Sequence, residues 1–166
     1  ILVMSLALFV FILQQITLSQ HLFIDEKINS FISNNQKPFL VEISKTIGYI
    51  FEPTIFIILF FLLVFYLIYE KRRAEAISLT ILTMISFLII QLIKILVHRL
   101  RPLDALVSEN TYSFPSGHAL MASVFFGILI YLFAHHIKSR KSKIILTILA
   151  TVVPLIIGFS RIYLNV

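Results

Sequence analysis

Five apolar runs dominate the sequence, and each is long enough to cross a membrane as a helix. A helix rises about 1.5 Å per residue, so roughly 20 apolar residues cross the hydrocarbon core of a bilayer. The chain of 166 residues is 59% hydrophobic and only 13% charged, and its mean hydropathy is +0.99. We therefore predict an all-α, polytopic membrane helix bundle that forms a single membrane domain over residues 1–166, with spans near 2–18, 51–69, 75–97, 118–134 and 144–160.

The first run has two interpretations, a transmembrane helix and a signal peptide. Gln14 and Gln15 interrupt the run, and no basic segment precedes it. The sequence opens with Ile rather than Met, so we expect the true N-terminus to lie upstream, which weakens the test for a signal peptide. We favour a transmembrane helix.

The segment between the first two spans, within residues 22–50, predicts two short amphipathic helices. Apolar residues recur there at helical spacing, and the polar stretch "NNQKP" separates the two halves. This pattern is typical of helices that lie in the membrane interface. A solvated loop is the alternative. The apolar positions are Ile24, Ile28, Phe31, Leu40, Ile43 and Ile47.

The positive charges predict the orientation of the bundle. The net charge of +6 raises the possibility of nucleic acid binding, but most basic residues flank the membrane spans, so we predict no nucleic acid partner. The segments "EKRRAE" (70–75) and "HHIKSRKSK" (135–143) are separated by two spans and hold seven of the 14 Lys and Arg residues. By the positive-inside rule both are cytoplasmic, and the loop 101–117 faces outward. The absence of cysteine excludes disulfides and thiol chemistry.

A polar stripe interrupts the outward end of the third span. If the helix is continuous, Gln91, Lys94, His98 and Arg101 share one face because their spacings are three, four and three. Ionisable groups in a membrane helix are costly and usually face a bundle interior or a water-filled site. Snorkelling of long basic side chains to the headgroups is the alternative. It accounts for Arg99, which lies off the stripe, but not for three basic residues on one face.

The stripe and the segment "PSGH" (115–118) together indicate an anion site. Lys94 and Arg101 supply permanent positive charge, and a guanidinium matches the oxygens of a phosphate. Ser116 or Pro115 begins a helix, whose first N–H groups have no partner within the helix. Gly117 lets an anion approach the backbone, and His118 can transfer a proton. Taken alone, Ser116 is also an ordinary helix cap and His118 an ordinary interfacial residue.

Three blocks of the sequence resemble a known family. "KILVHRLRP" (94–102) has the form K-x6-R-P, "PSGH" is the second block, and "SR" (160–161) begins a third of the form S-R-x5-H-x3-D. In this order they resemble the signature blocks of the type 2 phosphatidic-acid phosphatase family. By chance the first block occurs in about one chain in forty of this length and the second in about one in a thousand, so the pair is specific. The resemblance covers roughly residues 90–166.

The resemblance implies a fold and a role for each matching residue. It implies a six-helix membrane core, of which the sixth helix is missing from this chain, and it implies no metal or other cofactor. Lys94, Arg101, Ser116, Gly117 and Arg161 would bind the substrate phosphate, and His118 would protonate the departing alkoxide. A third-block histidine would attack phosphorus to form a phosphohistidine, which water then hydrolyses. His98 lies in the unspecified part of the first block and gains no role.

Three functions remain open from the sequence. The first is a lipid phosphate phosphatase of a bacterial cytoplasmic membrane, with phosphatidylglycerophosphate, phosphatidic acid, diacylglycerol pyrophosphate and undecaprenyl pyrophosphate as candidate substrates. The second is a non-catalytic relative that binds or transports a phosphorylated lipid. The third is a structural bundle with a basic interface. The bilayer is a partner in all three, and the sequence does not indicate an oligomeric state.

The third block departs from the family pattern and gives a first prediction. Five residues after Arg161 the sequence reaches Val166, so the histidine of the block would be the next residue. We expect a protein that consists of residues 1–166 alone to release no phosphate from a lipid phosphate, because it lacks the attacking group. Phosphate release that His118→Ala abolishes, measured on that 166-residue chain in detergent, would contradict this expectation.

Overall fold

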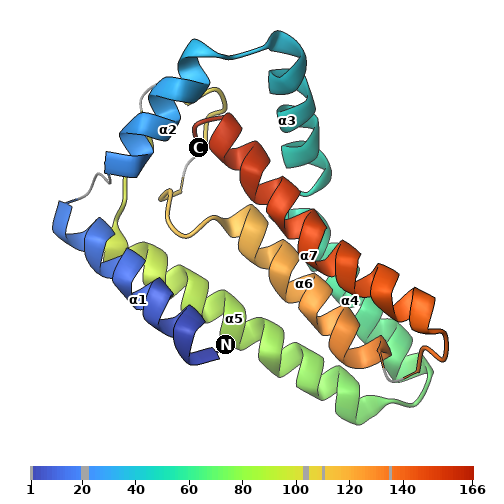
Figure 1. Ribbon diagram of the computed structural model, residues 1–166. Helices are drawn as coiled ribbons and strands as arrows, with labels where there is room; N and C mark the ends of the chain where they lie inside the picture. Colours follow the sequence, from blue (N-terminus) through green and yellow to red (C-terminus); the bar gives the residue numbers. More distant parts are fainter. Residues whose placement is uncertain (1, 20–22, 103–104, 110, 135) are drawn as a thin grey trace.

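Helices account for all the regular structure in the part of the chain that the computed structural model describes, residues 2–19, 23–102, 105–109, 111–134 and 136–166. Figure 1 shows how they are arranged. In chain order they are α1 (Leu2–Ser19), α2 (Phe23–Asn34), α3 (Pro38–Ile50), α4 (Pro53–Tyr69), α5 (Arg73–Val97), α6 (Gly117–Phe133) and α7 (Arg140–Tyr163).

The predicted all-helical membrane bundle is confirmed. The helices α1, α4, α5, α6 and α7 coincide with the five predicted spans to within a few residues. Among the described residues, three helical segments are long and apolar enough to cross a membrane, namely Pro38–Tyr69, Arg73–Val97 and Arg140–Tyr163. Two apolar helices are shorter, α1 and α6. At 17 residues α6 is about 25 Å long, so its ends lie near the edges of the hydrocarbon core.

The central helix of the bundle is α6, which packs against α4, α5 and α7, while α1 lies beside α5 (Figure 1). Two apolar clusters hold these helices together. One is centred on Leu67, Leu79 and Leu132 and joins α4, α5 and α6. The other contains Phe56, Ala122 and Ile157 and joins α4, α6 and α7. Ala122 is fully buried, so α6 approaches its neighbours closely at that point.

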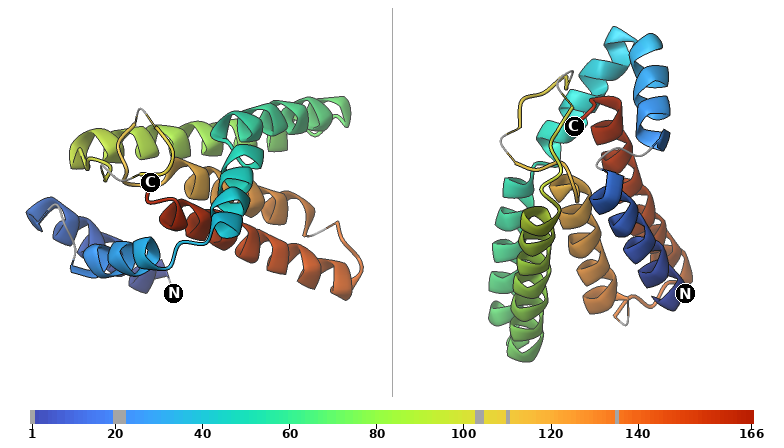
Figure 2. Two further views of the ribbon diagram at one scale, coloured as in Figure 1. Left: turned by 90° about the horizontal axis from the view of Figure 1, so that it is seen from above. Right: turned by 90° about the vertical axis from the view of Figure 1, so that its left-hand side faces the viewer.

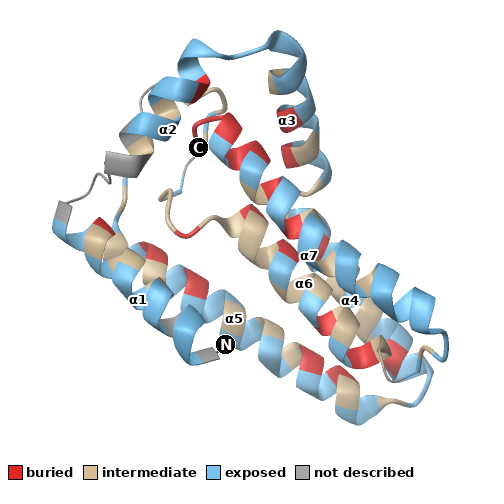
Figure 3. Cartoon of the chain, viewed as in Figure 1, coloured by how far each residue is buried: buried red, intermediate tan, exposed pale blue. Residues whose placement is uncertain are grey.

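Many large apolar side chains lie on the outer surface of the bundle. Figure 3 shows that buried residues are few along the helices and that intermediate and exposed residues make up most of them. Large apolar side chains such as Phe65, Leu88 and Phe159 are more than half exposed. In water such a surface would associate, whereas in a bilayer it is solvated by acyl chains. This distribution of side chains is that of a protein whose solvent is lipid.

Both short helices expected within 22–50 are present as α2 and α3. Phe31 on α2 and Leu40 and Ile43 on α3 are exposed, whereas Ile47 packs against the cluster around Ala122. Helix α3 packs against α7, and the Lys37 N–H donates a hydrogen bond of 3.1 Å to the Tyr163 hydroxyl. Helix α3 is thus held over the end of α7.

The two ends of the bundle differ in composition. The connections from α4 to α5 and from α6 to α7, which hold the basic segments, lie together at one end (Figure 1). Helices α2 and α3, the loop after α5 and the C-terminal end of α7 gather at the other end (Figure 2, right). The two basic loops therefore lie at the end of the bundle opposite α2, α3 and the loop after α5.

The close packing at Ala122 gives a second prediction. Ala122→Leu adds volume where α4, α6 and α7 meet, so we expect it to destabilise the bundle by about 1–3 kcal/mol. Thermal unfolding in detergent measures this effect. Ala74→Leu is the matched control, because Ala74 lies exposed near the start of α5 and the larger side chain has room there. An equal unfolding temperature for Ala122→Leu and the unsubstituted protein would contradict the packing described.

Candidate functional site

A cavity of 880 Å³ lies at the end of the bundle opposite the basic loops. Helices α3, α4, α5, α6 and α7 and the loop between α5 and α6 all contribute to its wall. Its size is within the range typical of small-molecule sites. The charged and polar side chains that line it include Lys45, Glu52, Gln91, Lys94, Arg101, Glu109, Thr111, His118 and Arg161.

Lys94 reaches the cavity from the last turn of α5. Its side chain is buried, with 7% of the residue exposed. The ammonium group donates hydrogen bonds to Thr111 Oγ1 at 3.2 Å and to the Tyr112 carbonyl at 2.9 Å. Buried ammonium groups need such partners, because an unpaired charge in an apolar interior is very costly. Loop atoms therefore compensate the charge of Lys94.

The prediction of one continuous helical stripe up to Arg101 is wrong. Helix α5 ends at Val97, and His98 adopts the left-handed conformation with φ 48°. Pro102 disfavours the helical conformation at Arg101 and cannot donate a helical hydrogen bond, so a helix could not have continued through Arg101 in any case. His98 turns away from the stripe and packs on the Tyr112 ring, with ring centroids 4.3 Å apart.

Arg101 still lines the cavity, although it reaches it from an extended segment. Its Nε donates to the Thr111 carbonyl at 2.7 Å, and its Nη2 lies 3.6 Å from Glu109 Oε2. Burial lowers the pKa of the Arg101 guanidinium, and the negative charge of Glu109 acts against that shift. Lys94 and Arg101 are thus brought together by a helix end and a loop rather than by helical periodicity.

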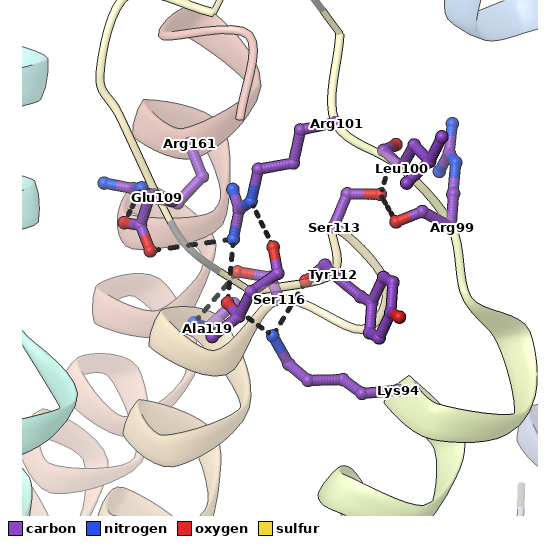
Figure 4. A network of polar contacts seen from close by, with 11 residues as sticks. Lys94, Arg99, Leu100, Arg101, Glu109, Tyr112, Ser113, Ser116, Ala119 and Arg161 are labelled. Atoms are coloured by element: carbon purple, nitrogen blue, oxygen red, sulfur yellow. Dashed lines mark hydrogen bonds and ion pairs between the residues drawn. The ribbon is translucent and has the colours of Figure 1, made fainter.

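Arg161 enters the cavity from the last turn of α7. The residue is only 5% exposed, and its Nη2 donates to Glu109 Oε1 at 2.5 Å. Figure 4 shows Arg101 and Arg161 on two sides of the Glu109 side chain, with Lys94 nearby. The neighbouring Ser160 hydroxyl donates to the Ile157 carbonyl inside the helix, so of the "SR" pair Arg161 alone faces the cavity.

The start of α6 forms the remaining side of the site. Ser116 is the N-cap of α6, and its hydroxyl accepts a hydrogen bond of 3.5 Å from the Ala119 N–H. The ordinary capping interaction is therefore present at Ser116. Gly117 and His118 line the cavity. A Cβ built on Gly117 would meet no atom within 4 Å, so the backbone there borders open space.

Sequence reasoning missed Glu109 and Thr111. Both lie in the loop between the first two blocks. Glu109 contacts Arg101 and Arg161, and Thr111 contacts Lys94 and Arg101. An acidic residue in a loop flanked by basic and phosphate-binding motifs was the available signal. No spacing rule for helices or strands applies to such a loop, so its fold could not be anticipated.

Gly48 on α3 was also missed. Its ideal Cβ position lies 2.7 Å from Nη1 of Arg161, closer than real Cβ atoms approach other groups. Glycine in a helix interior costs about 1 kcal/mol relative to alanine, so its presence at Gly48 was itself a sign of a close contact. Helix α3, expected only as an interfacial element, in fact forms a wall of the site through Lys45, Gly48 and Tyr49.

Comparison with known proteins agrees with this arrangement of motifs. The family model described as "PAP2 superfamily" matches residues 75–166, which include Lys94, Arg101, the "PSGH" segment and Arg161. The chain belongs to the PAP2 superfamily. The family resemblance of the sequence is thereby confirmed.

One sequence match and one structural match show which known proteins this PAP2 chain is similar to. It is 38% identical over 72 residues to phosphatidylglycerophosphatase B of Bacillus subtilis (strain 168), an alignment that covers 42% of this chain and 36% of that protein. The match thus spans about a third of that relative. The fold is similar to the crystal structure of the first transmembrane PAP2 type phosphatidylglycerolphosphate phosphatase from Bacillus subtilis, with a TM-score of 0.83 and 27% identity, covering 98% of this chain and 83% of that one.

The contact at Gly48 gives a third prediction. Gly48→Ala should displace the Arg161 guanidinium and weaken binding of inorganic phosphate about tenfold, the effect of losing one charge-assisted hydrogen bond. Isothermal titration of phosphate into the detergent-solubilised chain measures this. Gly127→Ala is the control, since a Cβ there meets nothing within 4 Å. Equal phosphate affinity of Gly48→Ala and Gly127→Ala would show that Gly48 does not position Arg161.

Proposed function

We propose that the protein is a membrane-embedded lipid phosphate phosphatase that acts on a phosphomonoester or pyrophosphate of a lipid. The observation that carries the proposal is the convergence of Lys94, Arg101 and Arg161 with the start of α6 around one cavity. These residues come from the three blocks that the sequence shares with the family. Their convergence from two helix ends and a loop is not expected of a purely structural bundle.

The site has the chemistry that phosphoryl transfer requires. The transferred group carries negative charge on its equatorial oxygens, and positioned cations and N–H donors stabilise it. Lys94, Arg101 and Arg161 supply the cations, and the backbone at Gly117 borders the space in which an oxygen would lie. Ser116 joins this set in the proposal, with its hydroxyl exchanging the capping bond to Ala119 for a bond to the substrate.

The cavity also suits an amphiphilic substrate. Phe87, Ile90 and Met121 line it together with the charged residues, and the helices around it present apolar surfaces to the bilayer. A phosphate can therefore enter the cationic part while the acyl or prenyl chain stays in lipid. Because the basic loops lie at the opposite end, the positive-inside rule places this site at the outer face of a bacterial cytoplasmic membrane in our proposal.

The proposed reaction has two steps. The histidine of the third block attacks phosphorus, an N–P bond forms, and the P–O bond to the lipid breaks while His118 donates a proton to the departing alkoxide. Water then attacks phosphorus and gives a proton back to His118, the N–P bond breaks, and inorganic phosphate leaves. In this sequence the attacking histidine would be the residue after Val166, with its partner aspartate four residues further on. The chain's own residues bind the phosphoryl group and supply the proton.

The alternative is a relative that binds or transports a phosphorylated lipid without hydrolysis. The same cation cluster supports that function, and the identity of the residue after Val166 separates the two. A histidine there favours hydrolysis, and any other residue favours binding. Phosphatidylglycerophosphate, phosphatidic acid, diacylglycerol pyrophosphate and undecaprenyl pyrophosphate all carry the group that these residues bind.

The fourth prediction concerns turnover by the protein expressed from its complete gene. We expect phosphate release from at least one of these four lipids in detergent, and a fall of at least about 100-fold in kcat for His118→Ala, the size of a general-acid contribution. His136→Ala is the control, because His136 lies in the connection from α6 to α7, one of the basic loops opposite the site, where its ring bonds the Leu132 carbonyl. Binding of all four lipids without phosphate release would favour the alternative.

A further inference from the structure

We propose that Glu109 is an internal competitor that occupies the position of the substrate phosphate and must be displaced before a phosphate binds. This inference rests on the proposed function, since it assigns Arg101 and Arg161 to the phosphate. It goes beyond that function by giving a role in substrate selection to a residue outside the three family blocks. The contacts of the loop between α5 and α6 carry it.

The Glu109 carboxylate bridges the two arginines. Its Oε1 accepts from Arg161 Nη2 at 2.5 Å, and its Oε2 lies 3.6 Å from Arg101 Nη2. A carboxylate has the negative charge and the paired oxygens with which a phosphate binds guanidinium groups. Glu109 thus makes with Arg101 and Arg161 the contacts that two phosphate oxygens would make.

The third cation, Lys94, donates its hydrogen bonds to the same loop. Lys94 donates to Thr111 Oγ1 at 3.2 Å and to the Tyr112 carbonyl at 2.9 Å. Arg101 donates in addition to the Thr111 carbonyl at 2.7 Å. All three cations therefore have oxygen partners from Glu109, Thr111 and Tyr112. Figure 4 labels Glu109, Tyr112 and the three cations. A phosphate that binds all three must replace loop oxygens.

The loop is held on both sides of Glu109. The Leu106 N–H donates to the Leu164 carbonyl at 3.0 Å, and the Ser113 N–H donates to the Arg99 carbonyl at 2.9 Å. These anchors keep the segment over the cavity when Glu109 leaves the arginines. The Glu109 side chain is 23% exposed, so a path from the cavity toward solvent is open to it.

The competitor has a consequence for substrate selection. A phosphodiester headgroup carries one negative charge, so its exchange for the Glu109 carboxylate gains little attraction. A phosphomonoester or pyrophosphate carries further charge and gains correspondingly more in a poorly solvated cavity. Glu109 therefore keeps the site free of the phosphodiester lipids that form the surrounding bilayer. It also favours departure of the phosphate product.

The test is a titration of inorganic phosphate, at about pH 8 where the dianion dominates, into the detergent-solubilised chain. We expect Glu109→Gln to bind phosphate about tenfold more tightly than the unsubstituted chain, because the amide keeps the size of the carboxylate without its charge. Dimethyl phosphate, a monoanion, should bind Glu109→Gln measurably and the unsubstituted chain far more weakly. Glu52→Gln is the matched control, since Glu52 lines the same cavity and accepts from Thr54 instead.

The outcomes separate this inference from the proposed function. Equal phosphate affinity in Glu109→Gln and the unsubstituted chain overturns the proposal that Glu109 competes with phosphate. The proposed phosphate site is unaffected by that result. Weaker binding in Glu109→Gln shows that Glu109 positions the arginines, and this also overturns the competitor. No phosphate binding in either chain overturns both proposals.

A second measurement needs no variant. It tests whether phosphate displaces Glu109 even if Glu109→Gln does not fold. Hydrogen exchange of the unsubstituted chain is followed while phosphate is raised to saturation. Displacement of Glu109 predicts faster exchange at the amides of residues 107–109, 111 and 112. Unchanged or slower exchange in that segment overturns the competitor.

Discussion

The burial of three cations at one end of an apolar bundle is the constraint on which the rest of the structure depends. Lys94 and Arg161 are almost fully buried, and Arg101 lies beside them. Charges of one sign repel one another, and each loses hydration on burial, so the cluster forms only where anionic and dipolar partners meet it. The loop between α5 and α6 provides these partners through Glu109, Thr111 and Tyr112. A cluster of this kind has a strong tendency to bind anions.

The helices set the positions from which this cluster is built. The last turns of α5 and α7 supply Lys94 and Arg161, and the first turn of α6 supplies Gly117 and His118. Three helix ends thus meet at one level, which is possible because α6 packs between α5 and α7. Helix α3 contributes to the wall of the cavity and approaches Arg161 so closely that a Cβ at Gly48 would displace the Arg161 guanidinium. The membrane helices provide a rigid frame, and the loop provides the adaptable part.

The sequence predicted the helices well and the site in part. Hydropathy located all five apolar helices, because lipid requires internally satisfied backbone hydrogen bonds and an apolar exterior. The family blocks identified Lys94, Arg101, His118 and Arg161, which the structure brings to one cavity. Helical periodicity failed beyond Val97, where α5 ends and His98 adopts the left-handed conformation. Glu109 and Gly48 were missed because their contacts depend on how a loop and an amphipathic helix pack, which local sequence does not determine.

The most direct test of the account is a crystal structure of the protein with tungstate, a tetrahedral oxyanion whose metal atom is located by anomalous scattering. The account predicts the oxyanion between Lys94, Arg101 and Arg161 and next to Gly117, with the Glu109 carboxylate withdrawn from both arginines. An oxyanion bound elsewhere on the protein, or Glu109 still bonded to Arg161 in the occupied site, would contradict it.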